Sequence, residues 1–279
     1  MSFKESRFAV ALVLVPVLYL MIQTAPSPLF FLLTTIAILR VQYEFYALFF
    51  SKREQGPVYV GLGLGALFAY FYPQHQLIPS VIFYGTATLF IMVVFIYQLF
   101  SFQEIKTTLT DSAVILLGVA YIVGFLGHLI LIRLMDHGPM LVIFLLLITW
   151  VGDAGAYYVG RAIGKRKLYP KVSPNKTVEG AIGGLMASLL TGLLAKASFL
   201  TLFSWGEMIT LSLLLGILGQ LGDLTESMFK RSAGVKDASS IIPAHGGLYD
   251  KLDSIAFTAP AFYYYLSCIE WYRRLPVGY

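Results

Sequence analysis

The feature that most constrains this sequence is a succession of long apolar runs separated by short polar breaks. A helix needs about 20 apolar residues to cross a bilayer. About nine runs approach that length, at residues 8–23, 29–50, 58–72, 80–100, 112–134, 140–163, 177–200, 207–228 and 252–272. Hydrophobic residues make up 58% of the 279 residues and charged residues 13%, unlike a soluble domain. The sequence therefore predicts an all-α polytopic membrane protein and excludes a disordered chain.

The basic residues predict the orientation of this protein in the membrane. Lys and Arg are retained in short cytoplasmic loops. With the N-terminus in the cytoplasm, 16 of the 20 Lys and Arg residues fall on the cytoplasmic side. The first run follows Lys4 and Arg7 and is interpreted as a retained signal anchor, since a turn and further runs come directly after it. No polar gap is long enough for a soluble domain, so we expect one membrane domain over residues 1–279.

Charged residues are concentrated in the second part of the chain. Residues 1–150 contain 13 Lys, Arg, Asp and Glu residues, and residues 151–279 contain 22. We therefore expect residues 1–150 to form a scaffold with lipid access, and residues 151–279 to supply the catalytic helices and cytoplasmic loops. The net charge of +5 comes without a basic nucleic-acid-binding module, so we expect no nucleic-acid partner. The single cysteine, Cys268, excludes an internal disulfide.

The first charged cluster has the residues of an anion-binding loop. Lys165, Arg166 and Lys167 precede the segment Ser173-Pro174-Asn175-Lys176-Thr177. Asn175 or Thr177 can cap the next helix, whose N-terminus would favour a phosphate beside Lys176. A basic loop with a capped helix and no ligand is the alternative. The spacing in residues 160–166 is one residue short of a Walker motif, which excludes a P-loop.

The second charged cluster contains carboxylates at helical spacing. Asp223, Glu226, Ser227 and Lys230 share one face of a helix, and Asp250 and Asp253 do so further along. Two helix ends that each offer a carboxylate suit Mg²⁺, and carboxylates near a bilayer are costly unless they serve a function. Asp153 is predicted either to support this site or to pair with a loop cation. Arg40 and Glu44, at i and i+4, are predicted to form a local pair.

The second cluster also matches the signature of a known family. Residues 227–253 resemble the signature of phosphatidate cytidylyltransferases (CDP-diacylglycerol synthases), through the pattern Ser227-x-Phe229-Lys230-Arg231-x4-Lys236-Asp237-x-Ser239-x2-Ile242-Pro243-x-His245-Gly246-Gly247-Leu248-x-Asp250-Lys251-Leu252-Asp253. Residues 153–157, 173–180 and 222–227 resemble other segments of that family. The resemblance covers residues 150–253, and the N-terminal half only by its series of spans. Lys251 stands where the family has Arg, which keeps the charge but loses the bidentate fork.

The resemblance implies a Mg²⁺-dependent reaction of CTP with phosphatidate that gives CDP-diacylglycerol and pyrophosphate for phospholipid synthesis. The site would lie at the cytoplasmic face of a bacterial inner membrane, among membrane lipids and in a homodimer. The implied metal ligands are Asp223, Asp250 and Asp253, and a second metal ion has further acidic residues available. The implied catalytic residues are Asp223, Lys230, Lys236, His245 and Asp250. The implied substrate-binding residues are Ser173, Asn175, Lys176, Thr177, Glu226, Ser227, Arg231, Asp237, Gly246 and Gly247.

Two other functions are consistent with parts of this pattern. A CTP-dependent polyprenol or phytol kinase, or a related lipid cytidylyltransferase, would bind the same nucleotide, but a kinase would release CDP instead of pyrophosphate. A secondary transporter would use Asp153 as an ion-coupling carboxylate within the membrane. Transporters commonly have paired broken helices in two repeats, whereas the ionisable residues here are concentrated at one end of one half.

Overall fold

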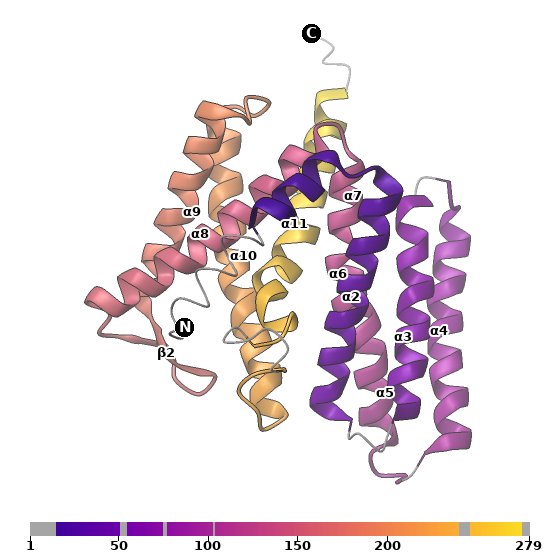
Figure 1. Cartoon of the computed structure of the whole chain (residues 1–279). Coiled ribbons are helices and arrows are strands. Elements are labelled where there is room, and N and C mark those ends of the chain that lie inside the picture. The colour runs from indigo at the N-terminus through magenta and orange to yellow at the C-terminus, as the bar shows by residue number, and fades with distance from the viewer. Residues whose placement is uncertain (1–14, 51–54, 75–76, 103, 240–245, 275–279) are drawn as a thin grey trace.

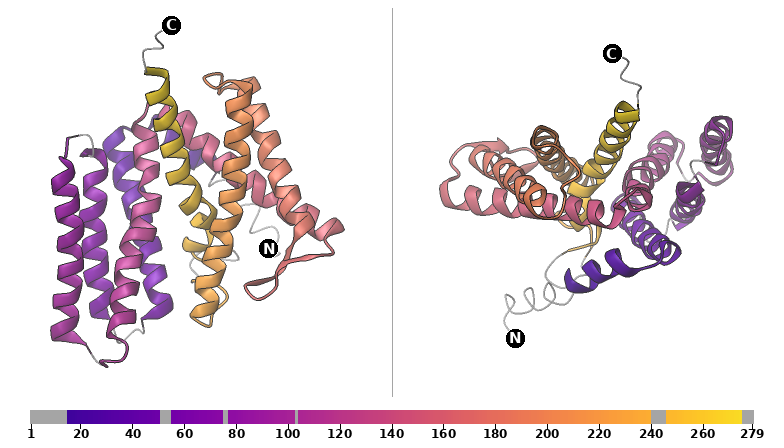
Figure 2. Two further views of the ribbon diagram at one scale, coloured as in Figure 1. Left: turned by 180° about the vertical axis from the view of Figure 1, so that it is seen from behind. Right: turned by 90° about the horizontal axis from the view of Figure 1, so that it is seen from above.

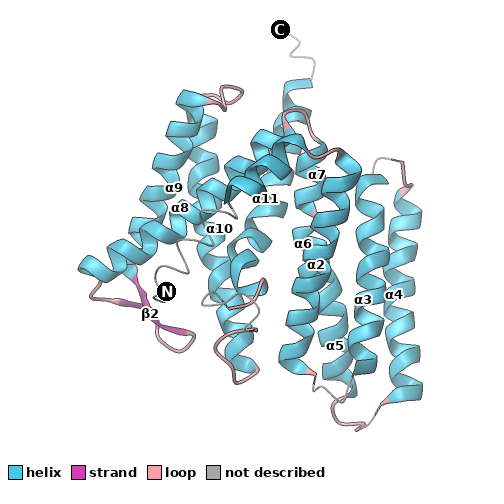
Figure 3. Ribbon diagram, viewed as in Figure 1, coloured by secondary structure: helices cyan, strands magenta, loops and turns pink. Residues whose placement is uncertain are grey.

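A computed structural model describes residues 15–50, 55–74, 77–102, 104–239 and 246–274 of the chain. This part is almost entirely helical, with one short pair of strands (Figure 3). A helix at Val15–Thr24 precedes α2. The remaining elements, in chain order, are α2 (Ser27–Phe49), α3 (Gln55–Phe71), η1 (Tyr72–Gln74), α4 (Ser80–Ser101), α5 (Thr108–Leu117), the π-helix η2 (Gly118–Val123), α6 (Gly124–Leu126), α7 (His128–Leu134), α8 (Gly138–Ile163), β1 (Lys167–Tyr169), β2 (Ser173–Thr177), α9 (Val178–Ser198), α10 (Trp205–Ser232) and α11 (Tyr249–Arg274).

Six helical segments of the described chain are long and apolar enough to cross a membrane. They are Ser27–Phe49, Ser80–Ser101, Thr108–Leu134, Gly138–Ile163, Val178–Ser198 and Trp205–Ser232. This agrees with an all-α polytopic membrane protein, but the predicted count of nine spans is not confirmed. The run at 58–72 lies mostly in α3, which has only 17 residues. The run at 252–272 lies in a helix with charges near both ends, and the first run is described only from residue 15.

The helices form two groups with α11 between them (Figures 1 and 2). Helices α2 to α7 make up one group, and α8, α9 and α10 the other. Helix α11 packs against α10 and α8 on one side and against α6, α7 and α2 on the other. The β1–β2 hairpin and the C-terminal end of α10 lie toward the lower end of the molecule in Figure 1. Both predicted charged clusters therefore lie at the same end.

An aromatic cluster joins the two groups near that end. Phe45 of α2 makes edge-on ring contacts with Tyr121 of η2, Phe229 of α10 and Tyr249 of α11, at centroid distances of 6.3, 5.9 and 6.0 Å. Phe45 and Tyr249 are fully buried. Such ring pairs stabilise contacts beyond the apolar area they bury. The cluster fixes the start of α11 against the N-terminal helices.

Candidate functional site

The hairpin and the start of α9 position the residues of the first charged cluster. Strands β1 and β2 pair in antiparallel orientation, with Lys167 opposite Thr177. The Thr177 hydroxyl accepts a hydrogen bond of 3.1 Å from the Gly180 amide, which confirms Thr177 as the cap of α9. The Glu179 carboxylate accepts bonds from the Lys165 and Arg166 amides and pairs with the Arg166 side chain. Lys176 is thereby held one residue before the cap.

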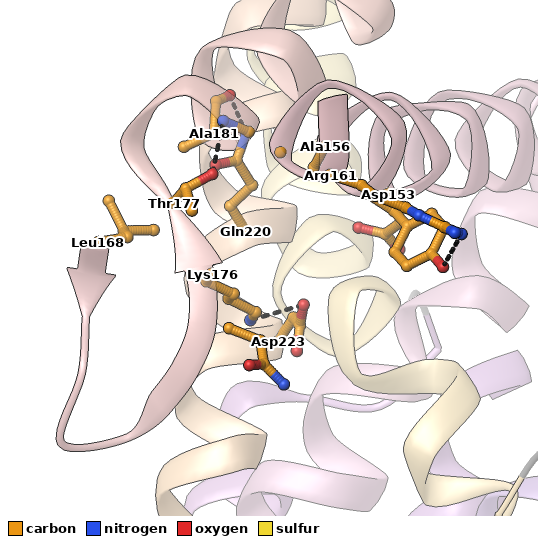
Figure 4. Close-up of a pocket in the computed structure, with 13 residues that line it drawn as sticks. Asp153, Ala156, Arg161, Leu168, Lys176, Thr177, Ala181, Gln220 and Asp223 are labelled. Atoms are coloured by element: carbon orange, nitrogen blue, oxygen red, sulfur yellow. Dashed lines mark hydrogen bonds and ion pairs between the residues drawn. The ribbon is translucent and has the colours of Figure 1, made fainter. Parts of the chain in front are cut away.

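A cavity of about 430 Å³ opens between this hairpin and helices α8 and α10. Its lining comprises Asp153, Ala156, Tyr157, Gly160, Arg161, Leu168, Asn175, Lys176, Thr177, Gly180, Ala181, Gln220 and Asp223. Figure 4 shows Lys176 and Asp223 directed toward each other, with 2.6 Å between Lys176 Nζ and Asp223 Oδ2. The Gln220 amide donates to the Ala181 carbonyl at 3.0 Å. The wall of the cavity thus carries two cations, two carboxylates and polar donors.

Three carboxylates from α10 and α11 converge beside the cavity. Asp223, Glu226 and Asp253 each offer an oxygen, and these atoms lie within 4.8 Å of one another. The absence of a side chain at Gly222 permits this approach, because a Cβ there would lie 2.6 Å from the Asp253 carbonyl oxygen. Helix α8 adds Asp153, whose Oδ2 accepts a hydrogen bond of 3.2 Å from Ser254 Oγ. The contact with Ser254 fits the supporting role predicted for Asp153.

Lys230 lies between two carboxylates of the second cluster. Its Nζ is 2.7 Å from Glu226 Oε1 and 2.6 Å from Asp250 Oδ1. The other Asp250 oxygen accepts hydrogen bonds from the amides of Gly247 and Ala238, at 2.7 and 3.2 Å. Burial alone would raise the pKa of Asp250, which precedes the apolar part of α11, but the Lys230 and Gly247 hydrogen bonds hold that pKa below its usual value. Asp250 is therefore held as an anion.

The structure brings most of the predicted site residues to one region. Asn175, Lys176, Thr177 and Asp223 line the cavity, and Glu226, Lys230, Gly247, Asp250 and Asp253 form the adjacent cluster. Among the predicted metal ligands, Asp223 and Asp253 lie together with Glu226, whereas Asp250 contacts Lys230 and two amides. Gly246 has a positive φ of 80°, where a side chain would be strained.

Other predicted residues lie at the edge of this region or outside the cavity lining. Arg231 donates to the Val172 and Val235 carbonyls and so ties the end of α10 to the hairpin. Lys236 and Asp237 are exposed. Ser173 and Ser227 are not among the described residues that line the cavity. His245 lies outside the described residues, as do Ile242 and Pro243 of the motif.

The structure also adds residues that the sequence analysis did not assign to the site. Tyr157, Arg161 and Gln220 line the cavity. Gln220 stands three positions before Asp223, so helical spacing would have placed both on one face. Glu44 of α2 contacts the segments on both sides of residues 240–245. Its signal was a carboxylate within an apolar run, which is unusual unless the group is used.

Comparison with known proteins finds curated bacterial relatives that match about half of this chain. A phosphatidate cytidylyltransferase of Staphylococcus saprophyticus is 43% identical over 150 residues, which are 54% of this chain and 57% of the relative. The protein of the same name from Staphylococcus aureus (strain COL) is 45% identical over 152 residues, again 54% of this chain and 57% of the relative. The matched part thus spans little more than half the length of these relatives.

A family model covers far more of the chain than these pairwise matches. The model described as the cytidylyltransferase family matches residues 5–269. That range includes both charged clusters, the cavity between them and the N-terminal helices. The chain belongs to the cytidylyltransferase family.

Proposed function

We propose that this protein transfers the cytidylyl group of CTP to phosphatidate, giving CDP-diacylglycerol and pyrophosphate for phospholipid synthesis. The observation that carries the proposal is the convergence of Asp223, Glu226 and Asp253 beside a cavity that contains Lys176. A reaction between two phosphate anions requires positive charge and fixed positions more than it requires a base. The family membership and the names of the relatives support the same reaction.

The acidic cluster fits a magnesium ion. Magnesium prefers oxygen ligands and is commonly held by one or two carboxylates together with substrate phosphates. Glu226 is buried, its Oε1 lies 2.7 Å from Lys230 Nζ, and one of its oxygens lies within 4.8 Å of oxygens of Asp223 and Asp253. The ion would be held by Asp223, Glu226 and Asp253. Asp250 lies next to this group, because Lys230 pairs with both Asp250 and Glu226. When bound, the ion would neutralise phosphate charge and orient the CTP phosphates.

The basic residues of the chain have complementary tasks. Lys176 is positioned to bind a CTP phosphate, since it lies in the cavity beside Asp223 and directly before the N-terminus of α9. Arg161 and Tyr157 lie on the α8 wall of the cavity, joined by a hydrogen bond of 3.3 Å. Both side chains are exposed, so they are suited to bind the headgroup of a lipid that enters from the bilayer. We therefore assign the phosphatidate side of the cavity to α8.

The proposed reaction breaks one bond and forms one bond at phosphorus. A phosphate oxygen of phosphatidate bonds to the α-phosphorus of CTP, and the bond from that phosphorus to the bridging oxygen of the β-phosphate breaks. The attacking oxygen belongs to a phosphate that is already ionised, so it requires no proton acceptor, and pyrophosphate leaves with the electrons of the broken bond. Lys176 and Lys230 would stabilise the charge on the departing group.

The proposed location follows from the two substrates. Phosphatidate stays in the bilayer and CTP is a soluble cytoplasmic nucleotide, so the site would lie at the cytoplasmic face of a bacterial membrane. The basic residues of the inner segments support this orientation. A second metal ion and a homodimer stay predictions from the sequence.

Product analysis tests the proposal. Purified protein is given CTP, Mg²⁺ and phosphatidate, and pyrophosphate release is measured together with the mass of the lipid product. We expect equal amounts of pyrophosphate and CDP-diacylglycerol, lost on addition of EDTA and in Asp223→Asn. The control is Glu104→Gln, because Glu104 is exposed and far from the cluster in sequence.

Two other results would contradict the proposal. Release of CDP from CTP with a phosphorylated polyprenol or phytol as product would identify a kinase. No turnover with any lipid acceptor, together with solute counterflow in sealed vesicles, would identify a transporter.

A further inference from the structure

Glu44 is a buried carboxylate in the part of the chain that carries few charges. It lies on α2 with 1% of its surface exposed. The predicted pair with Arg40 is confirmed at 3.1 Å, from Arg40 Nη2 to Glu44 Oε1. Burying a carboxylate is unfavourable unless donors compensate for the lost water. The other contacts of Glu44 therefore indicate why this carboxylate is buried.

Among the described residues, two further donors to Glu44 are Ser239, after α10, and Tyr249, the first residue of α11. Ser239 Oγ donates to Glu44 Oε1 at 2.9 Å, and the Tyr249 amide donates to Glu44 Oε2 at 2.8 Å. Gly247 lies so close that a Cβ there would contact Glu44 Oε2. One carboxylate on α2 thus holds Ser239 and Tyr249, which lie on either side of residues 240–245.

A short series of contacts connects Glu44 to the acidic cluster. Tyr249 immediately precedes Asp250, whose carboxylate accepts a hydrogen bond from the Gly247 amide and forms an ion pair with Lys230. Lys230 in turn lies 2.7 Å from Glu226. Fixing the Tyr249 amide fixes the first turn of α11, and the first turn of α11 sets where Asp250 meets Lys230. The ring contact of Phe45 with Tyr249 acts on the same turn.

We propose that Glu44 is a positioning residue, which holds the loop before α11 so that Asp250 and Lys230 keep their places in the site. Its effect on catalysis rests on the proposed function, whereas its effect on the loop does not. Among the described residues, the hydrogen-bond and ion-pair partners of Glu44 are Arg40, Ser239 and Tyr249, which belong neither to the group Asp223, Glu226 and Asp253 nor to the cavity lining. Misplacing a catalytic group by about 1 Å can reduce a rate on the order of 100-fold.

The test compares two buried polar residues on α2. Glu44→Ala removes the acceptor, and Glu44→Gln keeps an oxygen for the Tyr249 amide and an NH₂ that can donate to Ser239. The matched control is Gln42→Met. Gln42 is fully buried and two positions away, but its amide donates to Tyr46 Oη and the Gly61 carbonyl within the N-terminal group. Hydrogen exchange of the amides at 246–250 is measured, and then kcat and KM for CTP.

We expect Glu44→Ala to speed amide exchange at 246–250 by at least about tenfold and to lower kcat by roughly 10- to 100-fold, with a smaller change in KM. Glu44→Gln should lie between Glu44→Ala and the wild type. Gln42→Met should leave both quantities within about twofold, even where it lowers the unfolding temperature. Should Glu44→Ala fail to fold, Ser239→Ala removes one donor alone, and a rise in exchange of a few fold is expected.

Several results would overturn the proposal. The proposal fails if amide hydrogen exchange at residues 246–250 is unchanged in Glu44→Ala. If that variant does not fold, the same result in Ser239→Ala overturns it. Equal effects in Gln42→Met would do so too, since they would mean general destabilisation. Faster exchange with unchanged kcat would contradict the positioning role. If the wild type made no CDP-diacylglycerol while exchange changed as expected, the hold on the loop would be supported and the proposed reaction would fail.

Discussion

The glycines of the two groups of helices pack against different kinds of neighbouring atoms. Between α8 and α9, a Cβ at Gly184 would lie 2.9 Å from both Ala156 Cβ and the Gly152 carbonyl oxygen. In the N-terminal group, Gly61 and Gly118 instead accommodate the ring of Tyr46, whose hydroxyl donates to the Ile115 carbonyl at 2.7 Å. Backbone meets small side chains in one group, and a large polar ring fills the space in the other.

This difference decides where polar side chains are available for chemistry. In the N-terminal group, polar side chains form hydrogen bonds between helices, as those of Gln42, Tyr46 and Tyr72 do. In α8 to α10, glycine and alanine make close contacts, Ser188 Oγ donates to the Ile148 carbonyl at 3.3 Å, and further polar side chains lie at one end around the cavity. Glu44 is the exception that connects the two groups. The polar groups named in α2 and η1 thus contact neighbouring helices, whereas α8 and α10 also present polar groups to the cavity.

The largest effect is expected from a carboxylate of the site. Glu226→Gln keeps the shape of the side chain but removes its charge from the cluster with Asp223 and Asp253. Turnover should fall roughly 100-fold or more, equivalent to about 3 kcal/mol, and the Mg²⁺ concentration for half-maximal activity should rise. The assay is pyrophosphate release across a Mg²⁺ titration, with Glu104→Gln as control. Wild-type turnover and metal dependence would remove Glu226 from the site.

A smaller loss is expected when the cation of the cluster is removed. Lys230→Met leaves Glu226 and Asp250 without the ammonium that lies 2.7 and 2.6 Å from them. Unpaired buried anions should destabilise the protein by about 2 kcal/mol, measured by thermal unfolding in detergent, and lower turnover as well. Lys230→Arg keeps the charge and should recover most of the stability. The role of the cation would be contradicted if both variants unfolded at the wild-type temperature.

The all-α membrane architecture and the placing of the charged clusters on helices could be predicted from the sequence because each depends on local pattern, whereas the count of nine spans is not confirmed. Apolar runs mark helices, and the spacing of Asp223, Glu226 and Lys230 marks a common face of α10. On α3, a Cβ at Gly61 or Gly65 would meet the side chain of Tyr46 or Gln42, whereas a Cβ at Gly63 would meet no described atom within 4 Å.

Other features depend on contacts that no local pattern contains. Strands β1 and β2 have only three and five residues, and β2 includes Pro174, so no alternation marked them. Arg40 supplied a local partner for Glu44, which concealed the contacts with Ser239 and Tyr249, 195 and 205 positions away. The pairing of Asp250 with Lys230 likewise needs the crossing of α10 and α11.

The contrast in glycine use predicts a moderate effect on stability. Gly184→Ala would push α9 away from α8, because the new Cβ would lie 2.9 Å from both Ala156 Cβ and the Gly152 carbonyl oxygen. We expect a loss of about 1–2 kcal/mol, measured by thermal unfolding in detergent. Gly63→Ala, on α3, adds a methyl group where there is space and should be neutral or slightly stabilising. Equal unfolding temperatures for the two variants would mean that the close contact of Gly184 with α8 does not contribute to stability.

The smallest predicted effect concerns the cap that holds Lys176 at the cavity. Thr177→Ala removes the acceptor for the Gly180 amide and should cost about 1 kcal/mol, whereas Thr177→Ser keeps the hydroxyl. Because Lys176 directly precedes this cap, loosening it should also raise KM for CTP, and kcat should change less. Steady-state kinetics at varied CTP would separate the two parameters. If Thr177→Ser raised KM as much as Thr177→Ala, the methyl packing of Thr177 against Gly164 would matter more than the capping hydrogen bond.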